Sequence, residues 1–177
     1  MKISNSIPVN SVLYNQSQSS FYKDSVRHVT KRNDVQSWEL VAAFFHSAPT
    51  WVKLLLKLRN DIVKHFGLKV GSIDLSEVCP PFESGRNFCG FKLYSVKATE
   101  AIMGEDDVHL DFRISFIVDH GNELIMSTLV NINNTSGKVY MFVVKPFHRL
   151  LVSIMIKKMC KLIDEKSLPY YALMEEQ

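Results

Sequence analysis

The sequence lacks the local signatures of well-known catalytic and nucleotide-binding sites. It contains no Gly-x-Ser-x-Gly, Walker or Rossmann fingerprint, and its seven glycines leave no room for a glycine-rich phosphate loop. Its 21 basic and 18 acidic residues give a net charge of only +3, which is too small and too scattered along the chain to predict a nucleic-acid partner. The sequence therefore gives no direct indication of a catalytic, nucleotide-binding or nucleic-acid-binding site of these kinds.

The chain also lacks an export signal and a long apolar run. Residues 1–8 have no apolar core of signal-peptide length, and no segment approaches the roughly 18 uninterrupted apolar residues that span a bilayer. The three cysteines, Cys79, Cys89 and Cys160, are an odd number without redox or metal-binding spacing. We therefore expect a cytoplasmic protein with ordinary buried thiols, no membrane span, no metal and no cofactor.

The composition is typical of one globular domain, since hydrophobic residues make up 46% and charged residues 22% of the 177 residues. Residues 1–19 are rich in Ser, Asn and Gln, which predicts a flexible N-terminal segment. Residues 167–177 form a short C-terminal tail that ends acidic. We assign the single domain to residues 20–166.

The first half of the domain predicts a strand within residues 20–31 and then two helices. Apolar residues in 35–45 recur at three- and four-residue steps, and Asp34 is placed to cap that helix. A second apolar stripe of the same kind covers residues 51–66. The irregular stretch 69–90 follows, and its length is typical of a functional loop such as a lid.

From residue 91 the pattern changes to the alternation of apolar and polar residues that is typical of strands. The expected strands cover residues 91–96, 98–103, 108–118, 124–132 and 139–145. The last of them is apolar on both faces, which predicts a central, well-covered strand. Pro146 then ends this strand and begins a long helix with an apolar face that runs to Ile163.

This order of elements predicts an α+β fold of the helix-grip architecture. In it, a curved antiparallel sheet wraps around a long C-terminal helix, and two shorter helices follow the first strand. An antiparallel sheet with one apolar face needs a cover, and the last helix is long and amphipathic enough to provide it.

Three groups of residues carry a resemblance to a known family. They are residues 43–52 with 58–60 and 67–69, residues 103–113, and residues 128–130 with 137–140 and 146–149. Over about residues 20–165, the chain resembles a bacterial domain-of-unknown-function family of the START-like (SRPBCC, helix-grip) superfamily. That family looks similar to a domain found fused behind NAD(P)-binding reductase-like domains. The resemblance implies the fold and a cavity for apolar molecules between sheet and helix, but no reaction, and without the reductase-like domain no nicotinamide cofactor.

Five residues are candidate ligand-binding residues, and none is assigned a catalytic role. His109, Asp111 and Arg113 alternate on one predicted strand and therefore share a face, where a carboxylate-oriented His and an Arg could bind an anion. Because the intervening residues are apolar, the same trio also fits an outward-facing ion-pair network or a dimer interface. His148 and Arg149 open the predicted last helix, where they either help to bind an anion or simply cover its end.

The sequence predicts a binding module for an apolar or amphipathic small molecule, held between the sheet and the last helix. The alternatives are a cyclase, dehydratase or hydrolase that uses His109 or His148 as acid–base, and a ligand-free interaction domain that forms a homodimer. A cavity above about 300 Å³ between sheet and helix would favour the first reading.

Overall fold

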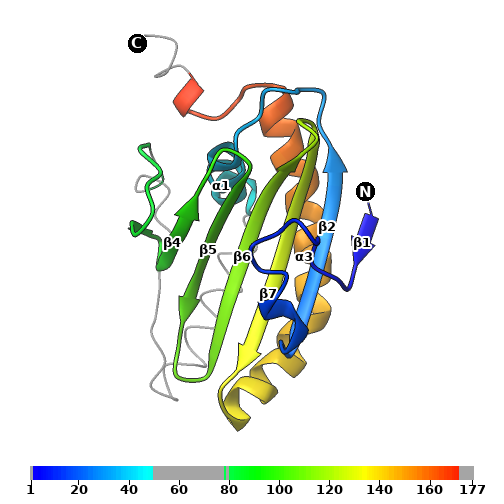
Figure 1. Cartoon of the computed structure of the whole chain (residues 1–177), viewed down its shortest axis with the longest axis vertical. Coiled ribbons are helices and arrows are strands. Elements are labelled where there is room, and N and C mark those ends of the chain that lie inside the picture. The colour runs from blue at the N-terminus through cyan, green and yellow to red at the C-terminus, as the bar shows by residue number, and fades with distance from the viewer. Residues whose placement is uncertain (1, 50–77, 79, 172–177) are drawn as a thin grey trace.

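The computed structural model describes residues 2–49, 78 and 80–171. They form an α+β helix-grip fold in which a seven-stranded antiparallel sheet is covered on one face by the long helix α3 (Thr135–Asp164) (Figure 1). The shorter helix α1 (Ser37–Ser47) packs beside α3 on the same face. The strand order in the sheet is β1-β2-β7-β6-β5-β4-β3.

In sequence order, the strands are β1 (Lys2–Ser4), β2 (Tyr22–Val29), β3 (Asn87–Phe88), β4 (Phe91–Val96), β5 (Glu100–Asp106), β6 (Leu110–Asp119) and β7 (Glu123–Ile132). A short 3-10 helix, η1 (Gln16–Gln18), precedes β2. The sequence prediction is confirmed for β2 and for β4 to β7, to within a few residues. A tight turn joins β6 and β7 in a hairpin, in which His120 and Gly121 adopt the positive φ values of 49° and 80° that such a turn uses.

Helix α1 is confirmed, but its predicted cap is wrong. Gln36 is the cap, because its side chain accepts from the backbone of Glu39 while the Glu39 carboxylate accepts from the Gln36 N–H at 2.8 Å. Asp34 instead pairs with Arg32, whose Nε lies 2.8 Å from its carboxylate. The predicted second helix at 51–66, Cys79 and the first part of the irregular stretch 69–90 lie outside the described residues.

The strand predicted at 139–145 is wrong, because these residues belong to α3. Asn134 caps α3 by accepting from the N–H of Gly137 at 3.1 Å, so the polar residues 133–137 form the start of this helix rather than a turn between two strands. Pro146, the predicted first residue of the helix, lies inside it. Valines and aromatic residues favour strands, and Pro146 cannot donate to the preceding turn. Packing of α3 against the sheet outweighs both effects.

The N-terminal segment, expected to be flexible, is packed on the opposite face of the sheet from α3 (Figure 1). Its first strand, β1, pairs with β2. Ile7 and Leu13 are buried in an apolar cluster with Ile102 and Leu129 of the sheet. A few apolar residues therefore attach this polar segment to the sheet, and it covers part of the face opposite α3.

Gly137 provides a test of the observed start of α3. A Cβ atom at this position would collide with the backbone oxygen of His109 in the preceding β5–β6 turn. We expect Gly137→Ala to lower the free energy of unfolding by about 1–3 kcal/mol in urea denaturation, because neither backbone has room to move apart. Ser136→Ala, at an exposed neighbouring position, is the control and should change it by less than about 0.5 kcal/mol. Equal stability of the two variants would contradict this helix start.

Candidate functional site

A buried polar cluster lies between the sheet and α3, in a layer that is otherwise apolar. Tyr22, Asp24 and Val26 alternate on β2 and so share the inner face, where Val26 belongs to the main core. Thr128 of β7 lies directly opposite Asp24 in the sheet. His148 reaches this position from α3. We call Tyr22, Asp24, Thr128 and His148 the Asp24 cluster.

The cluster is centred on one oxygen of the Asp24 carboxylate. The Tyr22 hydroxyl donates to Asp24 Oδ2 at 2.5 Å, and His148 Nε2 lies 3.6 Å from the same oxygen and 3.3 Å from Thr128 Oγ1. The Tyr22 and His148 rings meet edge to face, with centroids 5.7 Å apart. The Asp24 side chain is only 1% exposed, and its Oδ1 has no hydrogen-bond partner among the described residues. The cluster thus contains a buried carboxylate oxygen that can still accept a hydrogen bond.

The electrostatics of the cluster keep Asp24 ionised and Tyr22 neutral. Burial alone would raise the pKa of Asp24, but hydrogen bonding and charge from His148, with the Tyr22 and Thr128 hydroxyls, outweigh burial and lower this pKa. Burial raises the pKa of Tyr22 well above its usual range, and the neighbouring Asp24 acts in the same direction. At neutral pH the site therefore presents a carboxylate with a fixed phenol donor.

Apolar side chains surround this charged group on the sheet and on α3. Tyr22, Val130 and Met141 form one buried apolar cluster. Partly buried apolar residues pack against it, namely Leu110, Phe112, Ile132 and Tyr140. On the outer side, Lys145 Nζ lies 5.5 Å from the centroid of the Tyr22 ring. The Asp24 cluster is thus a buried charged group within an apolar layer.

The structure places His109 and Asp111 in local contacts at one end of the sheet. His109 lies in the β5–β6 turn, where its Nδ1 is within hydrogen-bond distance of the Asn134 side chain that caps α3. Asp111 accepts from the backbone N–H of Asp107 at 3.2 Å. Both side chains thereby hold the turn against the start of α3, and they do not meet in one site.

Arg113 forms an ion pair across neighbouring strands. Its guanidinium lies 2.6 Å from Asp106 of β5 and covers the Tyr94 ring at 4.0 Å from the centroid. The hydrogen bond from Arg113, followed by one from Tyr94, lowers the pKa of Asp106. This geometry is that of an ion-pair network on the face away from α3.

The prediction that His148 and Arg149 open a helix is wrong, because α3 already begins at Thr135. His148 faces the sheet within the Asp24 cluster. Arg149 is exposed and donates to the Asn5 side chain at 2.9 Å. It also hydrogen-bonds to the Tyr22 side chain, where it opposes the larger effect of burial, which raises the pKa of Tyr22. Of the five predicted residues, His148 and Arg149 reach the Asp24 cluster. Sequence reasoning missed Tyr22, Asp24 and Thr128, although the alternation of Tyr22, Asp24 and Val26 places a charge among inward-facing positions.

Two other buried carboxylates have structural roles, because both of their oxygens accept hydrogen bonds. The donors to Glu100 are the Ser11 hydroxyl at 2.7 Å, the Ser115 hydroxyl at 2.6 Å and the Val12 N–H at 3.0 Å. The donors to Glu39 are the Gln36 N–H, the Arg32 guanidinium and the Tyr171 hydroxyl. Glu100 fastens the N-terminal segment. Glu39 fastens the start of the C-terminal tail, in which Leu168 and Tyr170 are buried.

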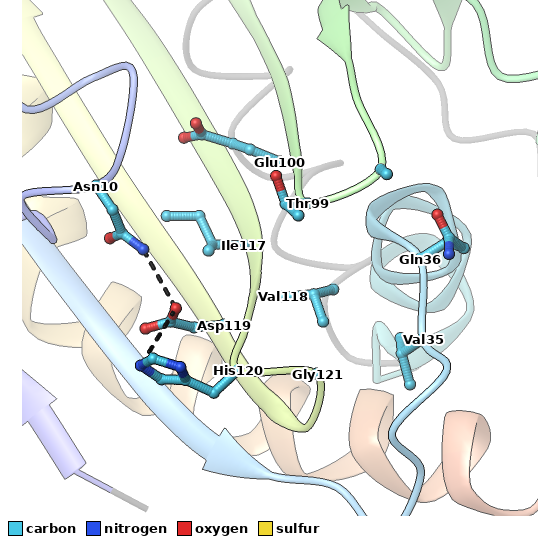
Figure 2. A pocket seen from close by; sticks show the side chains of 11 residues that line it. Asn10, Val35, Gln36, Thr99, Glu100, Ile117, Val118, Asp119, His120 and Gly121 are labelled. Atoms are coloured by element: carbon cyan, nitrogen blue, oxygen red, sulfur yellow. Dashed lines mark hydrogen bonds and ion pairs between the residues drawn. The ribbon is translucent and has the colours of Figure 1, made fainter.

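A pocket of 380 Å³ opens beside the β6–β7 hairpin, between the start of α1 and the N-terminal segment (Figure 2). Asn10 donates to Asp119 at 3.3 Å there, and His120 Nε2 lies 3.9 Å from the same carboxylate (Figure 2). A second pocket, of 270 Å³, lies by the C-terminal end of α3. Neither is the cavity predicted between the sheet and the last helix, and neither contains a residue of the Asp24 cluster.

Comparisons with known proteins place the chain in a family. The model of a family described as "Protein of unknown function (DUF2867)" matches residues 17–155, well over half of the chain. The chain belongs to the DUF2867 family. All four residues of the Asp24 cluster lie within the segment that matches the DUF2867 model.

No curated protein matches this DUF2867 chain. Among solved structures, the crystal structure of Ara h 8.0201 is similar, with 11% identity over 78% of this chain and 97% of the other, and a TM-score of 0.30. That score is too low to carry an argument about this chain. In the described part of the DUF2867 chain, no group of three or more His, Cys, Asp or Glu side chains is placed to hold a metal ion. Cys89 and Cys160 are buried, as predicted.

The lowered pKa of Asp24 predicts how stability depends on pH. A carboxyl group whose pKa falls on folding stabilises the protein above its unfolded value, 3.8 for Asp, and this contribution disappears as the pH falls through the folded value. We expect Asp24→Asn to cost about 1–3 kcal/mol of unfolding free energy at pH 7. The difference from the wild type should shrink below about pH 4 in urea denaturation.

Glu83→Gln, which removes an exposed carboxylate, is the control and should follow the wild-type curve at every pH. A difference between wild type and Asp24→Asn that stays constant, or grows, toward pH 3 would contradict an ionised Asp24 with stabilising partners.

Proposed function

We propose that this DUF2867 protein is a binding module for an amphipathic small molecule, held between the sheet and α3 with its polar end at the Asp24 cluster. The observation that carries the proposal is the buried Asp24 Oδ1, an acceptor without a hydrogen-bond partner among the described residues. A buried ionised acceptor left without a donor is costly, and a ligand donor would remove that cost.

The chemistry of the cluster favours a ligand whose polar end donates a hydrogen bond, such as a hydroxyl or an amine. Asp24 is a carboxylate that only accepts, and its other oxygen already receives the Tyr22 hydroxyl. The ligand body is apolar, because Val130, Met141 and the residues packed against them line the same layer. The START-like resemblance supports this position, since that superfamily commonly holds apolar molecules between the sheet and the last helix.

A second candidate function is acid–base catalysis by His148. It is favoured by the 3.6 Å approach of His148 Nε2 to Asp24, since a carboxylate can orient an imidazole and stabilise its protonated form. In that case Nδ1 of His148 would exchange the proton with the substrate. Turnover of ester or hydroxy-acyl substrates that is lost in His148→Gln, with the fold intact by circular dichroism, would select this function over simple binding.

The binding proposal is tested with N-phenyl-1-naphthylamine, a fluorescent apolar molecule with one N–H donor. We expect a saturable rise in fluorescence with one site per chain. Asp24→Asn should weaken binding by about fivefold or more, because it replaces a charged acceptor by a neutral one. Tyr22→Phe is the second variant, in case Asp24→Asn folds poorly, and should also change the affinity.

Asp119→Asn is the matched control, because it makes the same chemical change in the pocket beside the β6–β7 hairpin. It should leave the affinity unchanged. The proposal fails if the probe shows no saturable binding, or if Asp119→Asn weakens binding while Asp24→Asn does not.

A further inference from the structure

Helix α3 carries a continuous apolar stripe on the side that faces away from the sheet. Its members recur at three- and four-residue steps over about four helical turns. They are Val139, Phe142, Val143, Phe147, Leu150 and Ile154, which we call the outer stripe. Phe142 is 85% exposed and Phe147 57% exposed. Single exposed apolar residues are ordinary, but a contiguous stripe of this length marks an interaction surface.

The positive charge of the chain is concentrated on the same helix. Helix α3 contains six basic residues and one acidic residue, a net charge of +5. The other 15 basic and 17 acidic residues leave the rest of the chain at −2, so the net positive charge lies on α3 and is not scattered along the chain as expected from the sequence. The six basic residues are all exposed, namely Lys138, Lys145, Arg149, Lys157, Lys158 and Lys161.

The basic residues lie where they can act together with the outer stripe. At 100° per residue, Lys138, Lys145 and Arg149 follow one flank of the stripe, and Lys157 and Lys161 continue its line toward the C-terminal end. A helix with an apolar stripe and adjoining basic residues lies in the plane of a membrane interface, with its apolar side among the lipid chains and its cations at the headgroups.

We propose that the outer stripe and its adjoining basic residues dock this protein on the surface of an anionic bilayer. The match is one of charge and of apolar area, because anionic headgroups attract the exposed Lys and Arg while Phe142 and Phe147 enter the interface. Cytoplasmic leaflets carry such anionic lipids, which agrees with the predicted location. This inference goes beyond the binding of a small molecule at the Asp24 cluster and rests on different residues.

The helix docks on the membrane without crossing it. Within α3, a window of 18 residues has a mean hydropathy of 1.5 and is 22% buried, so length and composition alone would permit a span. However, the opposite side of α3 is buried against the protein, through Val152, Met155 and Ile156. Lys145 and Arg149 also fall in the middle of the helix. Spanning would require α3 to leave the sheet.

The charge distribution also argues against a second copy of the chain as the occupant. A two-fold contact through the outer stripe would bring two helices of charge +5 together, and like charges repel across such a contact. Nucleic acid would match the charge, but not the exposed phenylalanine and aliphatic side chains along the centre of the surface. An anionic lipid surface matches both properties.

The test is flotation of the full chain with vesicles of phosphatidylcholine alone, or of phosphatidylcholine with about 30% phosphatidylserine. We expect flotation with the anionic vesicles, little with the neutral ones, and a loss at high salt because salt screens the attraction. The double variant Phe142→Ser/Phe147→Ser and, separately, Lys145→Glu should each reduce the bound fraction by about fivefold or more.

Phe21→Ser is the matched control, because Phe21 is 58% exposed, nearly the same as Phe147, but lies beside β2. It should float like the wild type. Equal flotation of the control and the double variant would overturn the proposal, as would absence of flotation with anionic vesicles while the fold is intact. A dimer by light scattering that Phe142→Ser dissociates would also overturn it, in favour of a second copy. Binding of N-phenyl-1-naphthylamine should be unchanged in the double variant, which separates failure here from failure of the proposed function.

Discussion

Burial of the Asp24 carboxylate beneath α3 is the interaction on which the arrangement of this protein depends. An ionised group that is 1% exposed must have partners, and these come from three elements: Tyr22 of the same strand, Thr128 of β7 and His148 of α3. The helix must therefore present His148 to β2. Once His148 faces the sheet, helical geometry turns the residues on the opposite side of α3 outward, and these are the outer stripe. The contact of His148 with the buried charge and the packing of the apolar residues Val152, Met155 and Ile156 therefore require the same orientation of the helix.

Two other buried carboxylates of the fold, Glu100 and Glu39, are fully hydrogen-bonded within the protein. Glu100 and Glu39 are as buried as Asp24 or nearly so, but each has donors on both carboxylate oxygens. They hold the N-terminal segment and the start of the C-terminal tail in place. Asp24 differs because Oδ1 has no hydrogen-bond partner among the described residues. The contrast between satisfied and unsatisfied buried carboxylates separates the candidate site from the structural clusters.

Much of the fold could be predicted from local patterns, because strands β4 to β7 and helix α1 bury alternating or helically spaced residues. The start of α3 could not, because the same local signals fit two structures. Asn134 and Gly137 serve a turn as well as a helix cap, and the valines before Pro146 favour a strand until the sheet is present to pack against. The N-terminal segment is likewise too polar to predict burial, although Ile7 and Leu13 suffice to attach it.

The Asp24 cluster could not be predicted from the sequence either, because its residues meet only in the folded protein. His148 could be singled out as a titratable residue on an amphipathic helix, but Tyr22 and Asp24 are more than a hundred residues away on β2. Only the pairing of β2 with β7, and the register of α3 above them, bring these groups together. His109, Asp111 and Arg113 have a more conspicuous pattern, yet each has its partner at one end of the sheet. The alternating charges in the sequence therefore led to the exposed network. The Asp24 cluster is formed by residues far apart in the sequence, and no local pattern indicates that they meet.

The most direct test is a carboxyl-carbon NMR titration of Asp24 in the folded protein, with and without N-phenyl-1-naphthylamine. We expect a pKa below the ordinary value of 3.8 and a change in the Asp24 carboxyl resonance when the probe binds. A pKa at or above that value, or a resonance that the bound probe leaves unchanged, would contradict a stabilised Asp24 carboxylate that binds the ligand.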